Sequence, residues 1–254
     1  MVIAFLLILG AAVGSFLNVC IYRLPRGESI IYPPSHCPAC GKELSALDLI
    51  PLAGYLLLLG RCRYCKARIS PRYPLVELMS ALGFVYSWAT APNTLDFVFR
   101  IMLLSVFIVI FFIDLELKVI PDVASGLGII TGVIYNFLRG GFPLFFSSLF
   151  GMVLGFLLLF IVARLGELWF KKEVMGDGDL LLAALLGAAF GAGGMLLSLF
   201  IGYILAAAAA LIFLALRRLK FGQYIPFGPA LAVGGAITLF WGERLLEWYW
   251  GLFL

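Results

Sequence analysis

The chain has 254 residues, of which 63% are hydrophobic and only 13% are charged. A water-soluble globular protein carries roughly 25% charged residues, so this composition excludes an ordinary soluble domain. Long apolar runs recur along the chain, which is typical of an all-α polytopic membrane protein. The net charge of +4 is small and gives no reason to expect nucleic acid as a partner.

The first apolar run covers residues 1–22. No basic region precedes it, and it is too long for the core of a signal peptide, so we expect a retained first transmembrane helix. Apolar runs of about 17–22 residues predict eight transmembrane helices in all. Their predicted centres are Gly10, Gly83, Phe107, Ile130, Gly155, Gly187, Leu205 and Thr238. The run 180–216 must hold two of these helices, and we expect the turn between them at residues 191–194.

The basic residues lie mostly on one side of this predicted topology. If the N-terminus faces outward, only Arg100, Arg139 and Arg244 of the 18 Lys and Arg residues fall on the outer side. An excess of Lys and Arg marks the cytoplasmic side and attracts anionic membrane lipid. We therefore expect a cytoplasmic polar segment at residues 23–72, after the first helix. Residues 73–254 would then form a membrane core of seven helices.

This cytoplasmic segment carries two C-x-x-C pairs, Cys37/Cys40 and Cys62/Cys65, with 21 residues between them. In a zinc ribbon, two such knuckles supply four thiolates to a tetrahedral ion. Disulfides are disfavoured in the reducing cytoplasm, and the βαβ pattern of a thioredoxin-like redox pair is absent. Because four thiolates leave no open coordination position, we expect a structural zinc that folds the loop.

Two carboxylates stand at the predicted cytoplasmic ends of helices. Asp114 ends the third helix and Asp179 begins the sixth, so both are expected at the same depth. Two adjacent carboxylates can share one proton, so that one activates a water while the other protonates the reacting carbonyl. Such a pair cleaves an amide bond without a metal. Gly176 and Gly178 lack side chains beside Asp179, which would let a substrate backbone approach.

A purely structural role also accounts for these acids. Asp is a frequent helix N-cap, and Asp179 stands where a cap would lie for the helix that follows. Asp114 would then be an interfacial acid paired with Lys118. Spacing alone does not decide between the two interpretations.

Several further segments occur in one order along the chain, and together they carry a resemblance. They are 14-GSFLNVCIYRLP-25, the two C-x-x-C pairs, 71-PRYPLVELMSA-81, 112-FIDLELKVIPD-122, 175-MGDGDLLLAALLGAAFG-191 and 226-PFGPALAVGG-235. In these segments the chain resembles the prepilin leader peptidases, which are membrane aspartic proteases of the G-x-G-D type and often also N-methyltransferases.

The resemblance implies a multi-pass enzyme of the bacterial inner membrane. Its substrates would be type IV prepilins or type II secretion pseudopilins, cleaved after a glycine at the cytoplasmic face. Many members then methylate the new N-terminal residue with S-adenosylmethionine. Carried onto this chain, the resemblance makes Asp114 and Asp179 the catalytic residues, and Cys37, Cys40, Cys62 and Cys65 the zinc ligands.

The chain departs from the family pattern at two positions. Leu181 stands where the family usually has lysine, and Asp177 is acidic where a neutral residue is commoner. Both departures make the surroundings of Asp179 more negative. We expect activity to survive, because neither changes the two aspartates.

Two other functions fit part of the pattern. Presenilin and signal-peptide-peptidase proteases share G-x-G-D and a later P-A-L, which is present at residues 229–231. The cysteine loop and the 71–81 segment favour the prepilin family instead. A proton-coupled transporter would place acids near the bilayer midplane in paired repeats, and the sequence shows neither feature.

Overall fold

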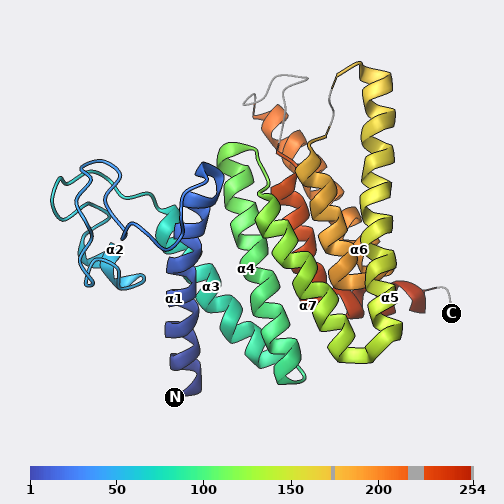
Figure 1. The fold of residues 1–254 in the computed structure, drawn as a ribbon, viewed down its shortest axis with the longest axis horizontal. Coiled ribbons are helices and arrows are strands. Elements are labelled where there is room, and N and C mark those ends of the chain that lie inside the picture. Colours follow the sequence, from blue (N-terminus) through green and yellow to red (C-terminus); the bar gives the residue numbers. More distant parts are fainter. Residues whose placement is uncertain (173–174, 217–225, 253–254) are drawn as a thin grey trace. The chain divides into compact units, whose positions relative to one another are not determined.

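A computed structural model describes residues 1–172, 175–216 and 226–252, and its regular elements are helices (Figure 1). Within these ranges the β-type pairings are two isolated bridges in the cysteine loop. The chain divides into two compact units, Met1–Phe97 and Val98–Leu254. The all-helical class predicted from the sequence is therefore confirmed.

Four of the described helical segments are long and apolar enough to cross a membrane: Val2–Arg26, Thr94–Leu117, Asp122–Phe170 and Asp177–Ala215. Their outer faces expose large apolar side chains, as lipid-facing helices do. On the third of these segments, for example, Phe146 and Phe150 are 62% and 63% exposed. The predicted count of eight spans stays a prediction.

The first unit contains α1 (Val2–Arg23), the 3-10 turn η1 (Leu24–Arg26), the short α2 (Ala53–Leu57) and α3 (Arg72–Thr90). Glycines on α1 let α3 approach closely. A Cβ built on Gly10 would lie 2.7 Å from the Ala81 Cα, and one built on Gly14 would lie 2.6 Å from the Glu77 Cα.

The first unit extends beyond the boundary at residue 73 that we expected between the loop and the membrane core. The Glu77 carboxylate of α3 accepts a hydrogen bond of 2.7 Å from the Leu52 backbone N–H in the loop. Because α3 also packs on α1, it groups with the first helix and the loop rather than with the later helices.

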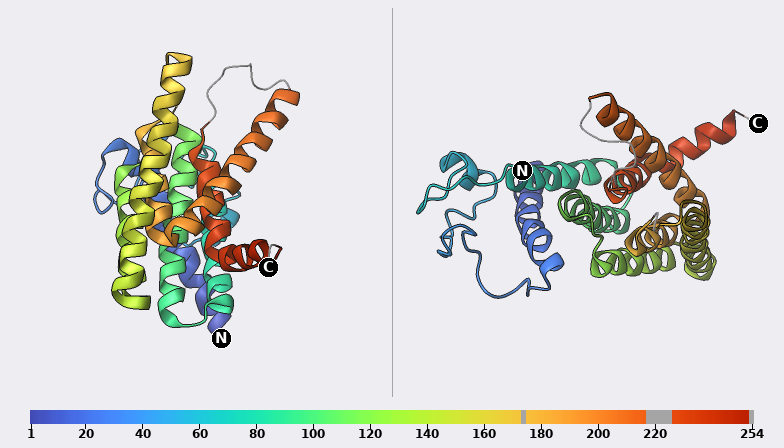
Figure 2. Two further views of the ribbon diagram at one scale, coloured as in Figure 1. Left: turned by 90° about the vertical axis from the view of Figure 1, so that its right-hand side faces the viewer. Right: turned by 90° about the horizontal axis from the view of Figure 1, so that it is seen from above.

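The second unit contains most of α4 (Thr94–Leu117), together with α5 (Asp122–Phe170), α6 (Asp177–Ala215) and α7 (Gly228–Gly251). Non-helical glycines interrupt α5 at Gly140 and Gly141, and α6 at Gly191. Both helices double back at these glycines (Figures 1 and 2). The turn expected at residues 191–194 is thus confirmed at Gly191, whose φ of 66° suits glycine.

Polar side chains compensate the break in α6. Asn136 Nδ2 donates hydrogen bonds to the carbonyl oxygens of Ala188 and Ala189, at 3.0 and 3.1 Å. Ser148 Oγ donates to the Ala188 carbonyl at 2.6 Å. In a hydrocarbon environment an unsatisfied backbone carbonyl is costly. These side chains satisfy the carbonyl groups that the break would otherwise leave without a hydrogen bond.

Close contacts between small residues hold α5, α6 and α7 together. A Cβ built on Gly151 of α5 would lie 2.5 Å from the Gly187 carbonyl oxygen of α6. One built on Gly234 of α7 would lie 3.0 Å from the Gly202 backbone nitrogen of α6. This packing brings the end of α4 and the starts of α6 and α7 to the same end of the unit (Figure 1).

Candidate active site

The structure brings together the two carboxylates singled out from the sequence. Asp114 lies near the end of α4 and is 3% exposed, and Asp179 lies in the first turn of α6 and is 5% exposed. The two side chains are close enough for their charges to interact. The other acids nearby, Glu116, Asp122 and Asp177, are exposed. The burial of both members of the pair separates them from ordinary surface acids.

The backbone N–H of a glycine lies beside each carboxylate. The Gly176 backbone N–H interacts with Asp179, and the Gly228 backbone N–H interacts with Asp114. Asp114 Oδ2 is buried, yet it has no hydrogen-bond partner among the described residues. A buried carboxylate oxygen without a partner is costly, and such an atom is available to a water or a substrate.

The segment around Asp179 is helical. The helix α6 begins at Asp177, and Gly176 is its N-cap with φ −80°. The Asp179 N–H donates to the Gly176 carbonyl at 3.1 Å. Asp179 therefore lies inside the first turn, and the interpretation of this residue as the N-cap is wrong.

The two glycines of this segment have different surroundings. Among the described residues, a Cβ on Gly176 would have only Asp179 Oδ2 nearby, at 4.0 Å, so none of them fills the space beside it. A Cβ on Gly178 would lie 2.7 Å from the Cβ of Ile120. The space at Gly178 is therefore filled by the chain itself, whereas at Gly176 the approach of a substrate backbone stays a prediction.

The start of α7 adds residues that the sequence analysis did not assign to the site. Gly228 stands in the 226–235 segment, and a Cβ there would lie 2.6 Å from Asp114 Oδ2. The preceding Phe227 contacts Tyr203 of α6, with ring centroids 4.8 Å apart, and Tyr203 is close enough to interact with the charge of Asp179. The glycine-proline pair at residues 228–229 was the available signal for a close backbone approach.

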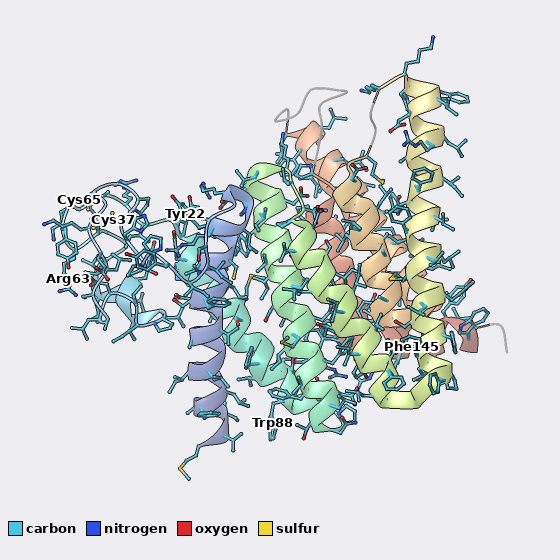
Figure 3. The ribbon with its side chains drawn as sticks, viewed as in Figure 1. Tyr22, Cys37, Arg63, Cys65, Trp88 and Phe145 are labelled. Atoms are coloured by element: carbon cyan, nitrogen blue, oxygen red, sulfur yellow. The ribbon has the colours of Figure 1, made fainter. Side chains whose placement is uncertain are left out.

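The four predicted zinc ligands also come together. The Sγ atoms of Cys37, Cys40, Cys62 and Cys65 all lie within 4.8 Å of one another, and those of Cys37 and Cys65 are 3.9 Å apart (Figure 3). Four sulfurs at about 2.3 Å from a tetrahedral zinc would be about 3.8 Å apart. The donor set and its spacing therefore fit zinc.

The two knuckles have the same backbone geometry. The Gly41 N–H donates to the Cys37 carbonyl at 2.8 Å, and the Lys66 N–H donates to the Cys62 carbonyl at 3.1 Å. Gly41 and Lys66 both have positive φ, 70° and 60°. Hydrogen bonds from the Cys65 and Tyr64 backbone N–H groups lower the pKa of the Cys62 thiol to about 7, while the pKa of the Cys65 thiol beside it is raised to about 11, so the thiolate that a metal needs is favoured at Cys62 alone of these two.

An ion pair connects the two halves of the loop. Asp48 accepts from Arg63 at 2.7 Å and from the Ser45 backbone N–H at 3.2 Å. The Arg63 guanidinium beside Asp48 holds the pKa of that carboxyl below its usual range. The pair thus joins the second knuckle to the segment that follows the first.

Fold and site together define a polytopic helical membrane protein with a buried aspartate pair in one unit and a four-cysteine cluster that fits zinc in the other. Comparison with known families agrees with this class. Residues 8–91 match the bacterial Peptidase A24 N-terminal domain, and residues 101–211 match the type IV leader peptidase family. The chain belongs to the type IV leader peptidase family.

Curated relatives match the chain over most of its length. It is 36% identical over 273 residues to the prepilin leader peptidase/N-methyltransferase of Pseudomonas aeruginosa, covering 96% of this chain and 91% of the relative. It is 34% identical over 250 residues to the type 4 prepilin-like proteins leader peptide-processing enzyme of Escherichia coli O78:H11, covering 91% of each. No solved structure matches the chain.

Proposed function

We propose that this chain is a membrane aspartic endopeptidase that removes the leader peptide of prepilins or pseudopilins, with Asp114 and Asp179 as the catalytic pair. One observation supports this assignment most strongly. Two buried carboxylates from distant helices interact with each other, and one of them presents an oxygen without a described partner. The names of the relatives supply the substrate class.

The chemistry follows from two carboxyl groups that hold one proton between them. The ionised carboxylate accepts a proton from a water, whose oxygen attacks the carbonyl carbon of the scissile amide. The protonated partner gives its proton to the carbonyl oxygen, forming a neutral tetrahedral intermediate. Collapse of that intermediate breaks the C–N bond as the amine nitrogen takes a proton from the pair and one hydroxyl of the intermediate returns a proton to it. Like charges held close together favour such proton sharing.

Because both carboxylates are buried, a substrate can reach them only where the surrounding chain leaves space. None of the described residues fills the space between Gly176 and Asp179 Oδ2, so an extended substrate backbone passing this glycine would meet the carboxylate. The site stands at the end of the unit where α4 ends and α6 begins. With the predicted orientation, this end is the cytoplasmic face of a bacterial inner membrane, with the N-terminus outside and eight spans in contact with lipid.

The zinc centre is proposed to be structural. Cys37, Cys40, Cys62 and Cys65 would hold the ion, which would supply cross-links between the knuckles and no open position for a substrate. Since the loop between η1 and α3 contains only the five-residue α2 and isolated bridges, the metal would be its main source of order.

N-methylation is the second proposed activity, and it is supported by the names of the relatives. The methyl donor would be S-adenosylmethionine. A glycine-rich loop leading from a strand into a helix holds many nucleotide-containing cofactors. The described ranges contain no extended strand that could form such a loop.

Both activities can be tested together. The purified, detergent-solubilised chain is incubated with a prepilin peptide that spans the leader junction, with and without S-adenosylmethionine, and the products are read by intact mass. We expect a mature peptide in both samples and an additional methyl group only with the donor. An intact peptide after prolonged incubation would overturn the protease assignment. A proton-coupled transporter would give that negative result and instead move protons across vesicles.

A further inference from the structure

One aliphatic side chain lies between the two halves of the candidate active site. Ile120 stands in the short connection from α4 to α5 and is 8% exposed. A Cβ built on Gly178 would lie 2.7 Å from the Ile120 Cβ, and one built on Gly228 would lie 2.9 Å from the Ile120 Cδ1. The two ends of this side chain therefore contact the starts of α6 and α7.

Each of the two glycines that Ile120 contacts lies next to one of the two carboxylates. Gly178 is the neighbour of Asp179 in the first turn of α6. Gly228 lies against Asp114, since its added Cβ would be 2.6 Å from Asp114 Oδ2. Because no described group makes a hydrogen bond to that oxygen, van der Waals packing has to contribute to fixing its position.

We propose that Ile120 is a positioning residue that sets the separation of the Asp114 and Asp179 carboxylates. Its Cβ and Cδ1 are joined through one carbon, so bond geometry fixes their separation, and the branched Cβ restricts the direction of the side chain to few rotamers. The side chain thereby seats the start of α6 and the start of α7 at defined places against the end of α4. This inference rests on the proposed function, because it assumes that the two carboxylates act as one unit.

A buried isoleucine that only fills the core would affect stability alone. The matched comparison is Ile108 on α4, which is 3% exposed and is buried away from the helix ends that carry the pair. Truncation to alanine removes the same atoms from both residues and leaves a cavity in both cases. A positioning role and a core-filling role therefore predict different turnover for the alanine variant, but a similar loss of stability.

The first experiment measures kcat and KM for cleavage of a prepilin peptide, together with the thermal midpoint. Ile120→Ala should lower kcat by about 10- to 100-fold with KM unchanged, because small displacements of catalytic groups have effects of that size. Ile108→Ala should lose a similar amount of thermal stability and keep its kcat. Ile120→Val, which keeps the Cβ branch but loses the Cδ1 that meets Gly228, should recover only part of the turnover.

Two failures of this experiment are distinguishable. If wild type and Ile108→Ala cleave the peptide and Ile120→Ala has the same kcat as Ile108→Ala, the positioning role is overturned while the proposed function stands. If the wild-type chain cleaves no peptide, the proposed function fails, and the positioning role falls with it.

A second measurement tests the contact without using activity. The thermal midpoints of Gly228→Ala, Ile120→Val and the double variant form a double-mutant cycle. The new methyl group at residue 228 would lie 2.9 Å from the Cδ1 of Ile120, which valine lacks, so the valine removes this overlap. The double variant should therefore be more stable than the sum of the single effects predicts. Strictly additive shifts would overturn the contact and the proposal.

Discussion

The backbone of Gly228 lies against the carboxylate of Asp114, so that a Cβ at residue 228 would be 2.6 Å from Asp114 Oδ2. Gly228→Ala must therefore move either the carboxylate or the start of α7. We expect cleavage of a prepilin peptide to fall by about 100-fold, as for misplaced catalytic groups elsewhere. The thermal midpoint should fall less than for a core truncation.

Gly193→Ala is the control for this change, because no atom of the described part of the chain lies within 4 Å of the Cβ it adds. It should leave both turnover and thermal midpoint close to wild type. If Gly228→Ala cleaves as fast as this control, the close approach of residue 228 to Asp114 has no catalytic importance.

The two glycines beside Asp179 should respond differently to an added methyl group. At Gly178 the methyl meets Ile120, so Gly178→Ala should lower the thermal midpoint and the cleavage rate together. At Gly176 the φ of −80° suits alanine and the space is open, so stability should be kept. A loss of cleavage by Gly176→Ala at unchanged stability would show that substrate passes this residue. Unchanged cleavage would argue against that path.

The packing of α5 on α6 predicts a pure stability effect. The Gly151 carbonyl and Gly187 are in such close contact that a methyl group at residue 187 overlaps the facing backbone. Gly187→Ala should lower the free energy of unfolding by about 1–3 kcal/mol, the usual cost of overpacking. The measurement is denaturant unfolding in mild detergent. Gly126→Ala on α5, with open space around the added atom, should show no such loss.

The cysteine loop predicts one zinc per chain. Replacing Cys37 and Cys40 with serine removes two of the four sulfurs, so the metal should be lost and residues 37–65 should exchange their amide hydrogens faster. Helical content should hardly change, because the long helices make their hydrogen bonds within themselves. Metal analysis checks the first point directly, and a zinc content near zero in an active, untreated preparation would contradict the site.

Much of the site could be predicted because its signals are local in the sequence. The four cysteines have the spacing of two knuckles, and the structure places their sulfurs within 4.8 Å of one another. The pairing of Asp114 with Asp179 followed from topology, since both were expected at helix ends on one side of the membrane. The break at Gly191 followed from a run of apolar residues too long for one span.

The remaining features depend on contacts between distant segments. Ile120 is one aliphatic residue among many, and nothing in its neighbourhood marks it as the side chain between α6 and α7. Gly178 and Gly176 look alike in the sequence, and only tertiary packing shows that the space beside Gly178 is occupied by Ile120. The grouping of α3 with α1 likewise depends on facing glycines and on the bond from Glu77 to the loop, which hydropathy does not register.

The central claim is that Asp114 and Asp179 act as one proton-sharing unit. Its most direct test compares the cleavage rates of Asp114→Asn, Asp179→Asn and the double variant on one prepilin peptide, with the exposed Asp122→Asn as control. Residues that act as a unit are strongly non-additive, so each single variant should lose cleavage and the double variant should be no slower than either. Asp122→Asn should cleave like wild type. Substantial cleavage by Asp114→Asn or Asp179→Asn would contradict the account.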